Sequence, residues 1–291
     1  MRISLSSGCA IVSKQGRGND FVPLGDFLRG VGGASAPTLF TGQASGLKPL
    51  PPSGHCHALV LATVLVVAAC STRIPAPTPA VSNATTFAQA GLVDIRSLVP
   101  DIAEDIRYAG TDNFVGVRID GYLAPRCFLR ESSAQALHRV ETALRKEGFR
   151  LQLFDCYRPA RAVAHFVRWA GDLQDQQTKA RHYPNLDKQA LLGEYIAPVS
   201  GHSRGATVDL TLLDCRADAG HCQALDMGTD FDFFDPRANA DSPALTPEQR
   251  DNRERLMKAM KSQGFRNYPQ EWWHFSLASE TSRAIYDIPV E

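Results

Sequence analysis

The chain has 291 residues, and its 31 Lys and Arg side chains are balanced by 31 Asp and Glu, so its formal net charge is zero. Because it has no basic field, the protein is not expected to bind nucleic acid. Hydrophobic residues make up 44% of the sequence, which is typical of a globular protein with an apolar core.

An apolar run covers residues 58–69 and is followed directly by Cys70 and Ser71. The run is shorter than the roughly 18 to 20 apolar residues that span a bilayer, but it suits the hydrophobic part of a signal peptide. With Cys70 it resembles the lipobox of bacterial lipoproteins, which implies export to the periplasm and a lipid anchor on Cys70. Ser71 favours the outer membrane by the same analogy. The alternative, a buried core segment, is disfavoured because the Pro-rich residues 74–80 have little capacity to pack.

This interpretation divides the chain into four parts. Signal peptides begin about 15 to 30 residues before their cleavage site, so residues 1–57 are interpreted as an over-extended start followed by the first part of the signal peptide, and they are not expected in the mature protein. Initiation near Leu47 would make Lys48 the basic start of the signal peptide. Residues 58–70 are then the signal run and lipobox, residues 71–91 a tether rich in Pro, Ser and Thr, and residues 92–291 one catalytic domain.

Local signals predict alternating helices and strands in this domain. Ser132 or Ser133 can cap a helix that ends at Gly148. A strand is expected at about residues 150–156 and a helix from Pro159. The apolar faces of these two helices consist of Ala136, Leu137, Val140 and Leu144, and of Val163, Phe166, Val167 and Trp169.

Further elements follow toward the C-terminus. Residues 206–213 and about 272–277 are expected to be strands. Thr246-Pro247-Glu248 is a helix start with proline at the first helical position, and Gly264 is the expected end. These elements predict an α+β fold: a single domain with a central, mainly antiparallel sheet flanked by helices.

Two short segments predict a catalytic zinc site on the sheet and its adjoining loops. They contribute His202 and Asp209 from residues 200–209, and Glu271 and His274 from residues 271–274. Zinc in an enzyme is held by three protein ligands, here His202, Asp209 and His274, with a fourth position for water. Glu271 is left to take the proton from that water, which is the chemistry of peptide-bond hydrolysis.

Each motif alone is weak, because a His seven residues before an Asp, or a lone Glu-x-x-His, is usually coincidence. Their combination favours a metal site. Glu271 and His274 are three residues apart, which places them on opposite faces of a straight strand. We therefore expect Glu271 in the turn before that strand.

These segments resemble the zinc D-alanyl-D-alanine dipeptidases of the VanX type, within a wider group of D-Ala-D-Ala carboxypeptidases and related peptidoglycan peptidases. The wider group shares Ser-x-His-x6-Asp and Glu-x-Trp-His, which Ser200, His202, Asp209, Glu271, Trp273 and His274 match. The dipeptidase branch is indicated by residues 105–109, 112–114, 120–122, 155–159 and 227–232. The likeness runs from about residue 92 to the end.

The resemblance implies one Zn²⁺ per chain, bound by His202, Asp209 and His274, with Glu271 as general base. It also implies that Arg158 stabilises the oxyanion, that Asp232 holds the ammonium of the dipeptide, and that Tyr122 and Ser200 line the pocket. Without it, Arg158 is more often a surface ion pair and Asp232 a loop cap. The chain departs from the family at Gly201, where a serine is expected, and at Cys156, where glycine is common.

Four cysteines lie in the catalytic domain, and four cysteines allow three pairings. Cys215 and Cys222 lie in one loop after the strand of Asp209, so this pair is favoured, which leaves Cys127 with Cys156. Disulfides agree with export to an oxidising compartment. The alternative, a thiolate zinc site, is disfavoured because the spacing matches no common cysteine motif.

The sequence as a whole predicts an exported, lipid-anchored zinc dipeptidase that cleaves D-alanyl-D-alanine into two D-alanines. Because it would not meet the cytoplasmic dipeptide pool, we expect a role in peptidoglycan turnover or D-Ala scavenging. One alternative is a D,D-carboxypeptidase or endopeptidase that acts on longer peptidoglycan peptides. Another is a non-catalytic cell-wall binding lipoprotein, although such a protein has no use for Glu271.

Overall fold

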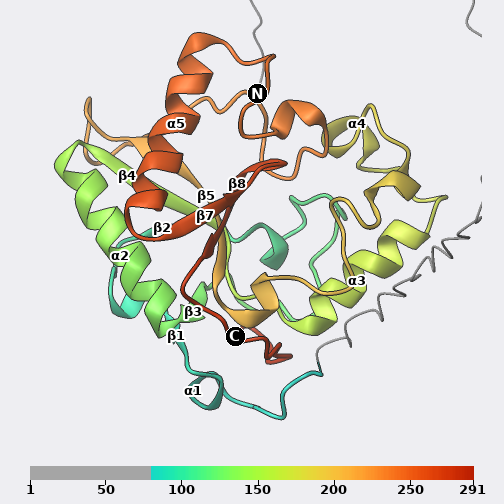
Figure 1. Cartoon of the computed structure of the whole chain (residues 1–291). Coiled ribbons are helices and arrows are strands. Elements are labelled where there is room, and N and C mark those ends of the chain that lie inside the picture. Colours follow the sequence, from blue (N-terminus) through green and yellow to red (C-terminus); the bar gives the residue numbers. More distant parts are fainter. Residues whose placement is uncertain (1–79) are drawn as a thin grey trace, which may run out of the picture. The chain divides into compact units, whose positions relative to one another are not determined.

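The computed structural model describes residues 80–291 (Figure 1). The over-extended start, the signal run, Cys70 and residues 71–79 of the tether lie outside the described residues. Within residues 80–291, every helix is too short or too polar to cross a membrane. The chain divides into the units Met1–Cys70 and Ser71–Glu291, and all described residues belong to the second unit.

The second unit is built on a six-stranded sheet with the strand order β2-β4-β5-β8-β7, in which β6 also pairs with β5. Only β2 and β4 are parallel; the other pairs are antiparallel. A separate two-stranded sheet joins β1 and β3. The strands are β1 Leu92–Asp94, β2 Ala103–Glu104, β3 Phe128–Arg130, β4 Phe149–Asp155, β5 Thr207–Asp214, β6 Gln223–Ala224, β7 Phe265–Tyr268 and β8 Glu271–Leu277.

Helices flank the sheet. Figure 1 shows α2 and α5 on one side, where they contact each other and the sheet, and α3 and α4 on the other. The mainly antiparallel α+β architecture predicted from the sequence is therefore confirmed. The helices are α1 Phe87–Ala90, α2 Glu131–Lys146, α3 Ala160–Gly171, α4 Lys179–His182 and α5 Pro247–Ser262, with 3-10 turns at Ile95–Ser97, Arg107–Ala109, Lys188–Leu191, His202–Arg204 and Pro236–Ala238.

Helix α2 ends as its sequence indicates but begins earlier than expected. Gly148 follows its C-terminus with φ of 78°, a left-handed conformation that glycine adopts without strain. The helix starts at Glu131, and Arg130 at its N-cap makes no side-chain capping bond. The serine caps predicted at 132 and 133 are therefore wrong; Ser133 is fully buried in the first turn.

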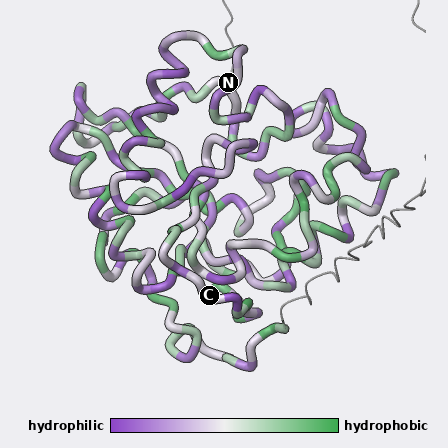
Figure 2. Tube along the Cα trace, in the orientation of Figure 1, coloured by the Kyte–Doolittle hydropathy of each residue, from purple (hydrophilic) through white to green (hydrophobic). Residues whose placement is uncertain are grey.

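Helix α5 follows its local signals closely. Thr246 caps the helix in a reciprocal capping box with Gln249, and Pro247 occupies the first turn. Figure 2 shows that most of this helix is hydrophilic, so only a narrow stripe packs inward. Within that stripe Leu256 and Met260 are completely buried.

The expected boundary at residue 92 is too late. Thr86 and Gln89 form a capping box at the start of α1, and Ala90 is buried. The Phe87 ring stacks on Phe128 at a centroid distance of 3.7 Å. The backbone of Ser82 also bonds to the carbonyl of Ile285 at 2.8 Å. Residues 82–91 thus belong to the folded domain, because their apolar side chains have a partner surface that the sequence did not reveal.

Residues 80–291 contain two disulfides, Cys127–Cys156 and Cys215–Cys222. The first is buried, with Cys127 at 0% exposure and Cys156 at 2%, and it joins the end of β4 to the residue before β3. The second closes a loop after β5 whose residues 216–221 are exposed. The two bridges therefore lie in very different surroundings.

Candidate active site

Three side chains from separate elements converge at one point on the sheet. Asp209 is the third residue of β5, and strand pairing places it directly opposite His274 of β8. His202 begins the 3-10 turn His202–Arg204, which leads into β5. Gly205 ends this turn with φ of 75°, a left-handed conformation that favours glycine, and a Cβ there would also press against a methyl group of Leu92.

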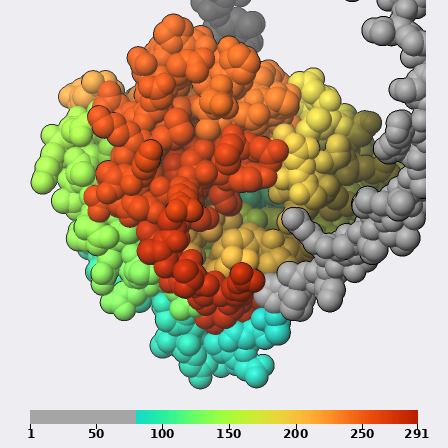
Figure 3. Space-filling view, in the orientation of Figure 1, coloured from blue at the N-terminus to red at the C-terminus, as the bar shows by residue number. Residues whose placement is uncertain are grey.

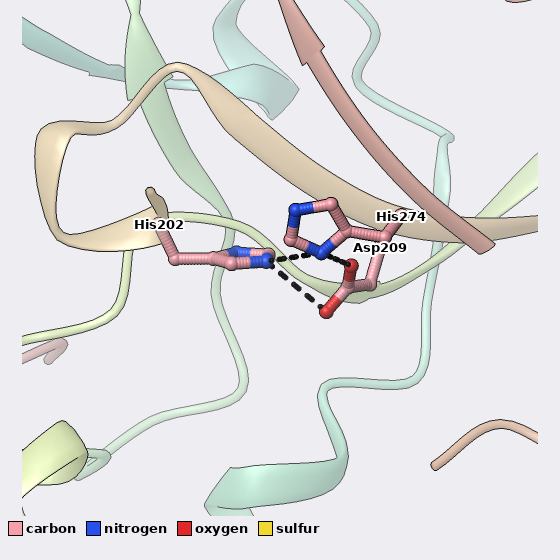
Figure 4. A group of neighbouring side chains, drawn as sticks. All are labelled: His202, Asp209 and His274. Carbon is pink, nitrogen blue, oxygen red and sulfur yellow. Dashed lines mark hydrogen bonds and ion pairs between the residues drawn. The ribbon is translucent and has the colours of Figure 1, made fainter. Parts of the chain in front are cut away.

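The ligand atoms of the three side chains are close enough to bind one metal ion (Figure 4). His202 Nε2 lies 3.2 Å from Asp209 Oδ2 and 3.3 Å from His274 Nδ1, and His274 Nδ1 lies 3.0 Å from Asp209 Oδ1. Ligands bound to zinc at about 2.0–2.1 Å with tetrahedral angles lie about 3.3 Å from one another. The observed separations match this spacing.

The surroundings of the triad also fit a cation. Asp209 is 2% exposed, yet its Oδ1 accepts no hydrogen bond from residues 80–291. A buried carboxylate oxygen without a donor is costly unless a positive charge lies beside it. Although burial opposes ionisation, His202 and His274 hold the pKa of Asp209 below its ordinary value. Asp209 is thus in the charged form that a metal requires.

His202 is oriented by groups behind it. Its Nδ1 lies 2.7 Å from the carbonyl of Cys156 and 3.2 Å from Asp155 Oδ2. Because both neighbours are acceptors, Nδ1 carries the proton and donates it, and the Nε2 lone pair faces Asp209 and His274. This arrangement of an acceptor behind a histidine is how proteins fix the tautomer of a metal ligand.

Glu271 lies beside the triad but belongs to the strand rather than to the turn before it. It is the first residue of β8, and its Oε2 lies 3.4 Å from His274 Nδ1. The pairing of β7 and β8 shifts between Asn267 and Tyr268, so that Tyr268 pairs with Glu271. This irregularity breaks the strict alternation of faces and turns Glu271 toward the same side as His274. Burial raises the pKa of Glu271 to about 7, a value suited to a general base at neutral pH.

The triad and Glu271 lie on a cavity of about 300 Å³, lined also by Ser200, Arg158 and Asp232. Figure 3 shows the surface hollowed between the C-terminal strands and the segment 193–201, which supplies one wall. This segment is bridged to the β7–β8 hairpin: the Tyr268 hydroxyl donates to the Glu194 carbonyl at 3.3 Å, and the Gln270 amide donates to Glu194 Oε1 at 3.1 Å. The bridge narrows the cavity on that side.

Arg158 points into this cavity from the turn between β4 and α3. Its guanidinium donates twice to Asp155 Oδ2 at 2.9 Å and lies 3.6 Å from Asp209 Oδ2. The rings of Tyr108 and Phe166 face it at 5.1 and 4.9 Å. Burial disfavours its charge, but Asp155 and its other neighbours raise the pKa of Arg158 well above the ordinary value. A fixed positive charge therefore faces the metal-binding residues.

Asp232 lines the same cavity and has an unusual backbone. It is the only described non-glycine residue with positive φ, at 57°. Its carboxylate accepts from the Tyr108 hydroxyl at 2.9 and 3.2 Å. Burial and the nearby Asp209 raise the pKa of Asp232 well above its ordinary value. A cation next to this carboxylate would offset both effects.

Of the two residues predicted to line the pocket, Ser200 and Tyr122, only Ser200 lies at the cavity. Ser200 lines the cavity, and its hydroxyl accepts from the backbone N–H of His202 at 3.2 Å. Tyr122 does not line it. Its ring is 1% exposed, and its hydroxyl donates to Asp155 Oδ1. The predicted pocket position of Tyr122 is therefore wrong, because Asp155 and Arg158 lie between its hydroxyl and the cavity.

Two residues of the site were missed by sequence reasoning. Asp155 is fully buried and contacts Tyr122, Arg158 and His202. Tyr108 holds Asp232 and faces Arg158. Both lie within segments that carried the family resemblance, Asp105–Ala109 and Asp155–Pro159. The one sequence feature that could have indicated a role for Asp155 is its position as a charged residue directly before Cys-Tyr-Arg-Pro, the turn that carries Arg158.

A peptidase M15 family model, described as D-ala-D-ala dipeptidase, matches residues 88–290. A D-alanyl-D-alanine dipeptidase of Streptomyces coelicolor is 41% identical over 198 residues, covering 67% of this chain and 96% of the relative. A D-alanyl-D-alanine dipeptidase of Enterococcus faecium is 36% identical over 203 residues, covering 69% of this chain and 98% of the relative. A D-alanyl-D-alanine dipeptidase of Escherichia coli is 32% identical over 191 residues, covering 66% of this chain and 86% of the relative.

The matched region contains every residue of the cavity described above, from Tyr108 to His274. The match covers well over half of the chain, and the relatives are covered almost in full. The chain is therefore an enzyme that belongs to the D-Ala-D-Ala dipeptidase family of metallopeptidases.

Proposed function

We propose that this protein hydrolyses D-alanyl-D-alanine to two molecules of D-alanine, using one Zn²⁺ held by His202, Asp209 and His274. The observation that carries the proposal is that one cavity of about 300 Å³ contains this triad together with Glu271, Arg158 and Asp232. Each of these groups matches one requirement of dipeptide hydrolysis. The relatives named above as dipeptidases cover the same region.

The base and the oxyanion partner follow from their positions. A zinc ion at the triad would supply Lewis acidity, which acidifies a water molecule and polarises the scissile carbonyl. Glu271, with a pKa of about 7, takes the proton of the attacking water and delivers it to the leaving amine. Arg158 places its fixed charge where the carbonyl oxygen becomes negative. Asp155 keeps the Arg158 side chain in that orientation through two contacts of 2.9 Å.

Selectivity for a free dipeptide rests on Asp232. Its carboxyl group is the buried acidic group at the cavity that the triad and Glu271 do not use, and within residues 80–291 it lacks a cationic partner in hydrogen-bond reach, in agreement with its raised pKa. The ammonium group of a dipeptide would supply that partner. A longer peptide has an uncharged amide at the same place, so it would leave Asp232 uncompensated.

The proposal is tested by measuring D-alanine release from D-Ala-D-Ala, from N-acetyl-D-Ala-D-Ala and from a peptidoglycan pentapeptide. We expect hydrolysis of the free dipeptide alone. Asp232→Asn should lose activity on the dipeptide and narrow the difference between the dipeptide and its acetylated form. Asp241→Asn is the matched control, since its side chain is not part of the cavity. Cleavage of the pentapeptide without cleavage of the dipeptide would instead assign the protein as a D,D-carboxypeptidase or endopeptidase.

We further propose that the enzyme acts outside the cytoplasm as a lipid-anchored lipoprotein and recycles D-Ala from peptidoglycan. Support comes from the lipobox-like Val67–Ser71 and from the two disulfides, which persist in oxidising compartments. Fractionation of native cells should place the protein with the membranes, and Cys70→Ala should release it. Recovery of the native protein from the cytosol would contradict the location and with it the turnover role.

A further inference from the structure

The Cys127–Cys156 disulfide lies directly behind the metal-binding triad. The carbonyl of Cys156 accepts the 2.7 Å hydrogen bond from Nδ1 of His202. The residue before it, Asp155, provides the second acceptor of that nitrogen at 3.2 Å. The orientation of one ligand therefore depends on where the main chain passes at positions 155 and 156.

The sheet does not hold this part of the chain by itself. Pairing of β4 with β5 is irregular between Leu153 and Asp155, and it ends at the pair Asp155 and Asp209. Beyond that pair, the backbone of Tyr157 bonds to the carbonyl of Phe128 at 2.9 Å. Phe128 begins β3 and Cys127 directly precedes it, so both this bond and the disulfide attach the end of β4 to the start of the same short strand.

The other end of β3 holds the turn that carries His202. The backbone N–H of Arg130 donates to the carbonyl of Gly205 at 2.7 Å, and its guanidinium donates to the carbonyl of Arg204 at 3.3 Å. The stretch 127–130 thus contacts both the end of β4, which carries the acceptor of His202, and the turn in which His202 lies. Cys127, directly before β3, supplies the covalent link of this stretch.

We propose that the Cys127–Cys156 disulfide is a positioning element of the metal centre. By fixing the Cys156 carbonyl relative to β3, it holds the His202 imidazole in the orientation that presents Nε2 to the metal. This inference rests on the proposed metal site. Loss of an outer acceptor of a ligand histidine typically lowers metal affinity about 10- to 100-fold. Because loss of the disulfide displaces the carbonyl without deleting it, we expect a smaller loss, about 3- to 10-fold.

The chain offers a matched control in its second disulfide. Cys215–Cys222 closes a loop after β5, and the intervening residues 216–221 are exposed. Neither cysteine lines the cavity or contacts a ligand residue. Variants are preferred to thiol reductants because thiolates bind zinc themselves.

The experiment compares the native protein with Cys127→Ala/Cys156→Ala and with Cys215→Ala/Cys222→Ala. Zinc affinity is measured by chelator competition well below the melting temperature, and the visible spectrum is recorded with Co²⁺ in place of zinc. We expect the 127/156 variant to lose about 3- to 10-fold in zinc affinity and to change its Co²⁺ spectrum, while the control keeps both. Native affinity and an unchanged spectrum in the 127/156 variant would overturn the proposal. Failure of the native protein to bind zinc would refute the proposed function instead.

A second measurement uses the native protein and so does not depend on how the variant folds. Because coupling between equilibria is reciprocal, bound zinc should make the disulfide harder to reduce at equilibrium if the disulfide supports zinc binding. In a glutathione redox buffer the disulfide is reduced to two thiols while two glutathione molecules are oxidised to their disulfide, and free zinc is held constant by a metal buffer; alkylation and mass spectrometry then report each cysteine. We expect zinc to lower the fraction of Cys127–Cys156 that is reduced at equilibrium and to leave that of Cys215–Cys222 unchanged. An equal reduced fraction of Cys127–Cys156 with and without zinc would contradict the proposal.

Discussion

Asp155 is the residue on which the site depends most, so Asp155→Asn is the most informative substitution. The side chain is completely buried, and its carboxylate accepts from Tyr122 and twice from Arg158, and lies 3.2 Å from His202 Nδ1. Asparagine has the same shape, but it removes the negative charge and replaces one acceptor oxygen with a donor. The guanidinium of Arg158 is then left buried without its main counter-charge.

The expected magnitude follows from these contacts. Removing one partner of a buried ion pair costs about 3–5 kcal/mol, and the isosteric amide recovers a part of this by still accepting one hydrogen bond. We therefore expect a loss of about 3 kcal/mol in unfolding free energy. Asp155→Asn disturbs one of the two acceptors behind His202 and leaves the nearer one, the Cys156 carbonyl, so zinc affinity should fall by about 10-fold.

Denaturant unfolding and chelator competition would measure the two effects. Glu147→Gln is the control, because this carboxylate is 62% exposed and pairs with Arg255 at 3.5 Å on the surface. That pair should contribute at most about 1 kcal/mol and nothing to zinc affinity. If Asp155→Asn were as stable as the control and bound zinc with native affinity, the reasoning on Asp155 would be refuted.

Three further predictions concern the substrate group, the pH dependence and the core. Asp232→Asn should raise KM for D-Ala-D-Ala more than it lowers kcat, since the carboxylate binds the ammonium away from the reacting bond; a pure kcat effect in steady-state kinetics would contradict this. Burial lowers the pKa of His182. Below about pH 6.5 the unfolded chain therefore binds a proton at His182 that the folded protein does not bind, so the free energy of unfolding decreases as the pH falls. The native protein should exceed His182→Asn in unfolding free energy by the full amount above that pH, and this difference should shrink at lower pH. A larger difference in unfolding free energy at pH 5 than at pH 7, measured by denaturation curves, would contradict this prediction. Leu137→Ala, at a site with 0% exposure on α2, should cost about 2–5 kcal/mol, and a loss near zero would show a core able to collapse around the gap.

The elements that the sequence predicted well are those whose signals are local. The capping box of Thr246 and the left-handed glycines at 148 and 264 lie within a few residues of the ends that they mark. Alternating apolar residues define β5 in the same way, to within one residue of the predicted range. Such features need no knowledge of the tertiary structure.

The site was predicted to the extent that it is written in two short motifs. His202, Asp209, Glu271 and His274 were singled out by residue type and spacing, and the structure brings them together. The same motifs could not reveal that an irregular β7–β8 pairing turns Glu271 toward His274. That geometry depends on hydrogen bonds between strands, which a linear pattern does not encode.

The residues that escaped prediction act over long sequence distances. Asp155 contacts His202, which lies 47 positions later, and Tyr108 contacts Asp232 after a separation of 124. Tyr122 was placed on the wrong side of this network, because nothing local distinguishes a pocket tyrosine from one behind the pocket. Residues 82–91 were assigned to the tether for the same reason, since Phe87 becomes a core residue only through its contact with Phe128.

The roles of the metal site and of Glu271 are tested most directly by metal-dependent release of D-alanine from D-Ala-D-Ala, measured for the native protein and for Glu271→Gln. We expect turnover by the native protein that is abolished by a chelator and restored by Zn²⁺. We also expect a fall in kcat of at least about 10²-fold in Glu271→Gln, with zinc still bound. Chelator-resistant turnover, or a Glu271→Gln variant with native kcat, would contradict the assigned metal site and base.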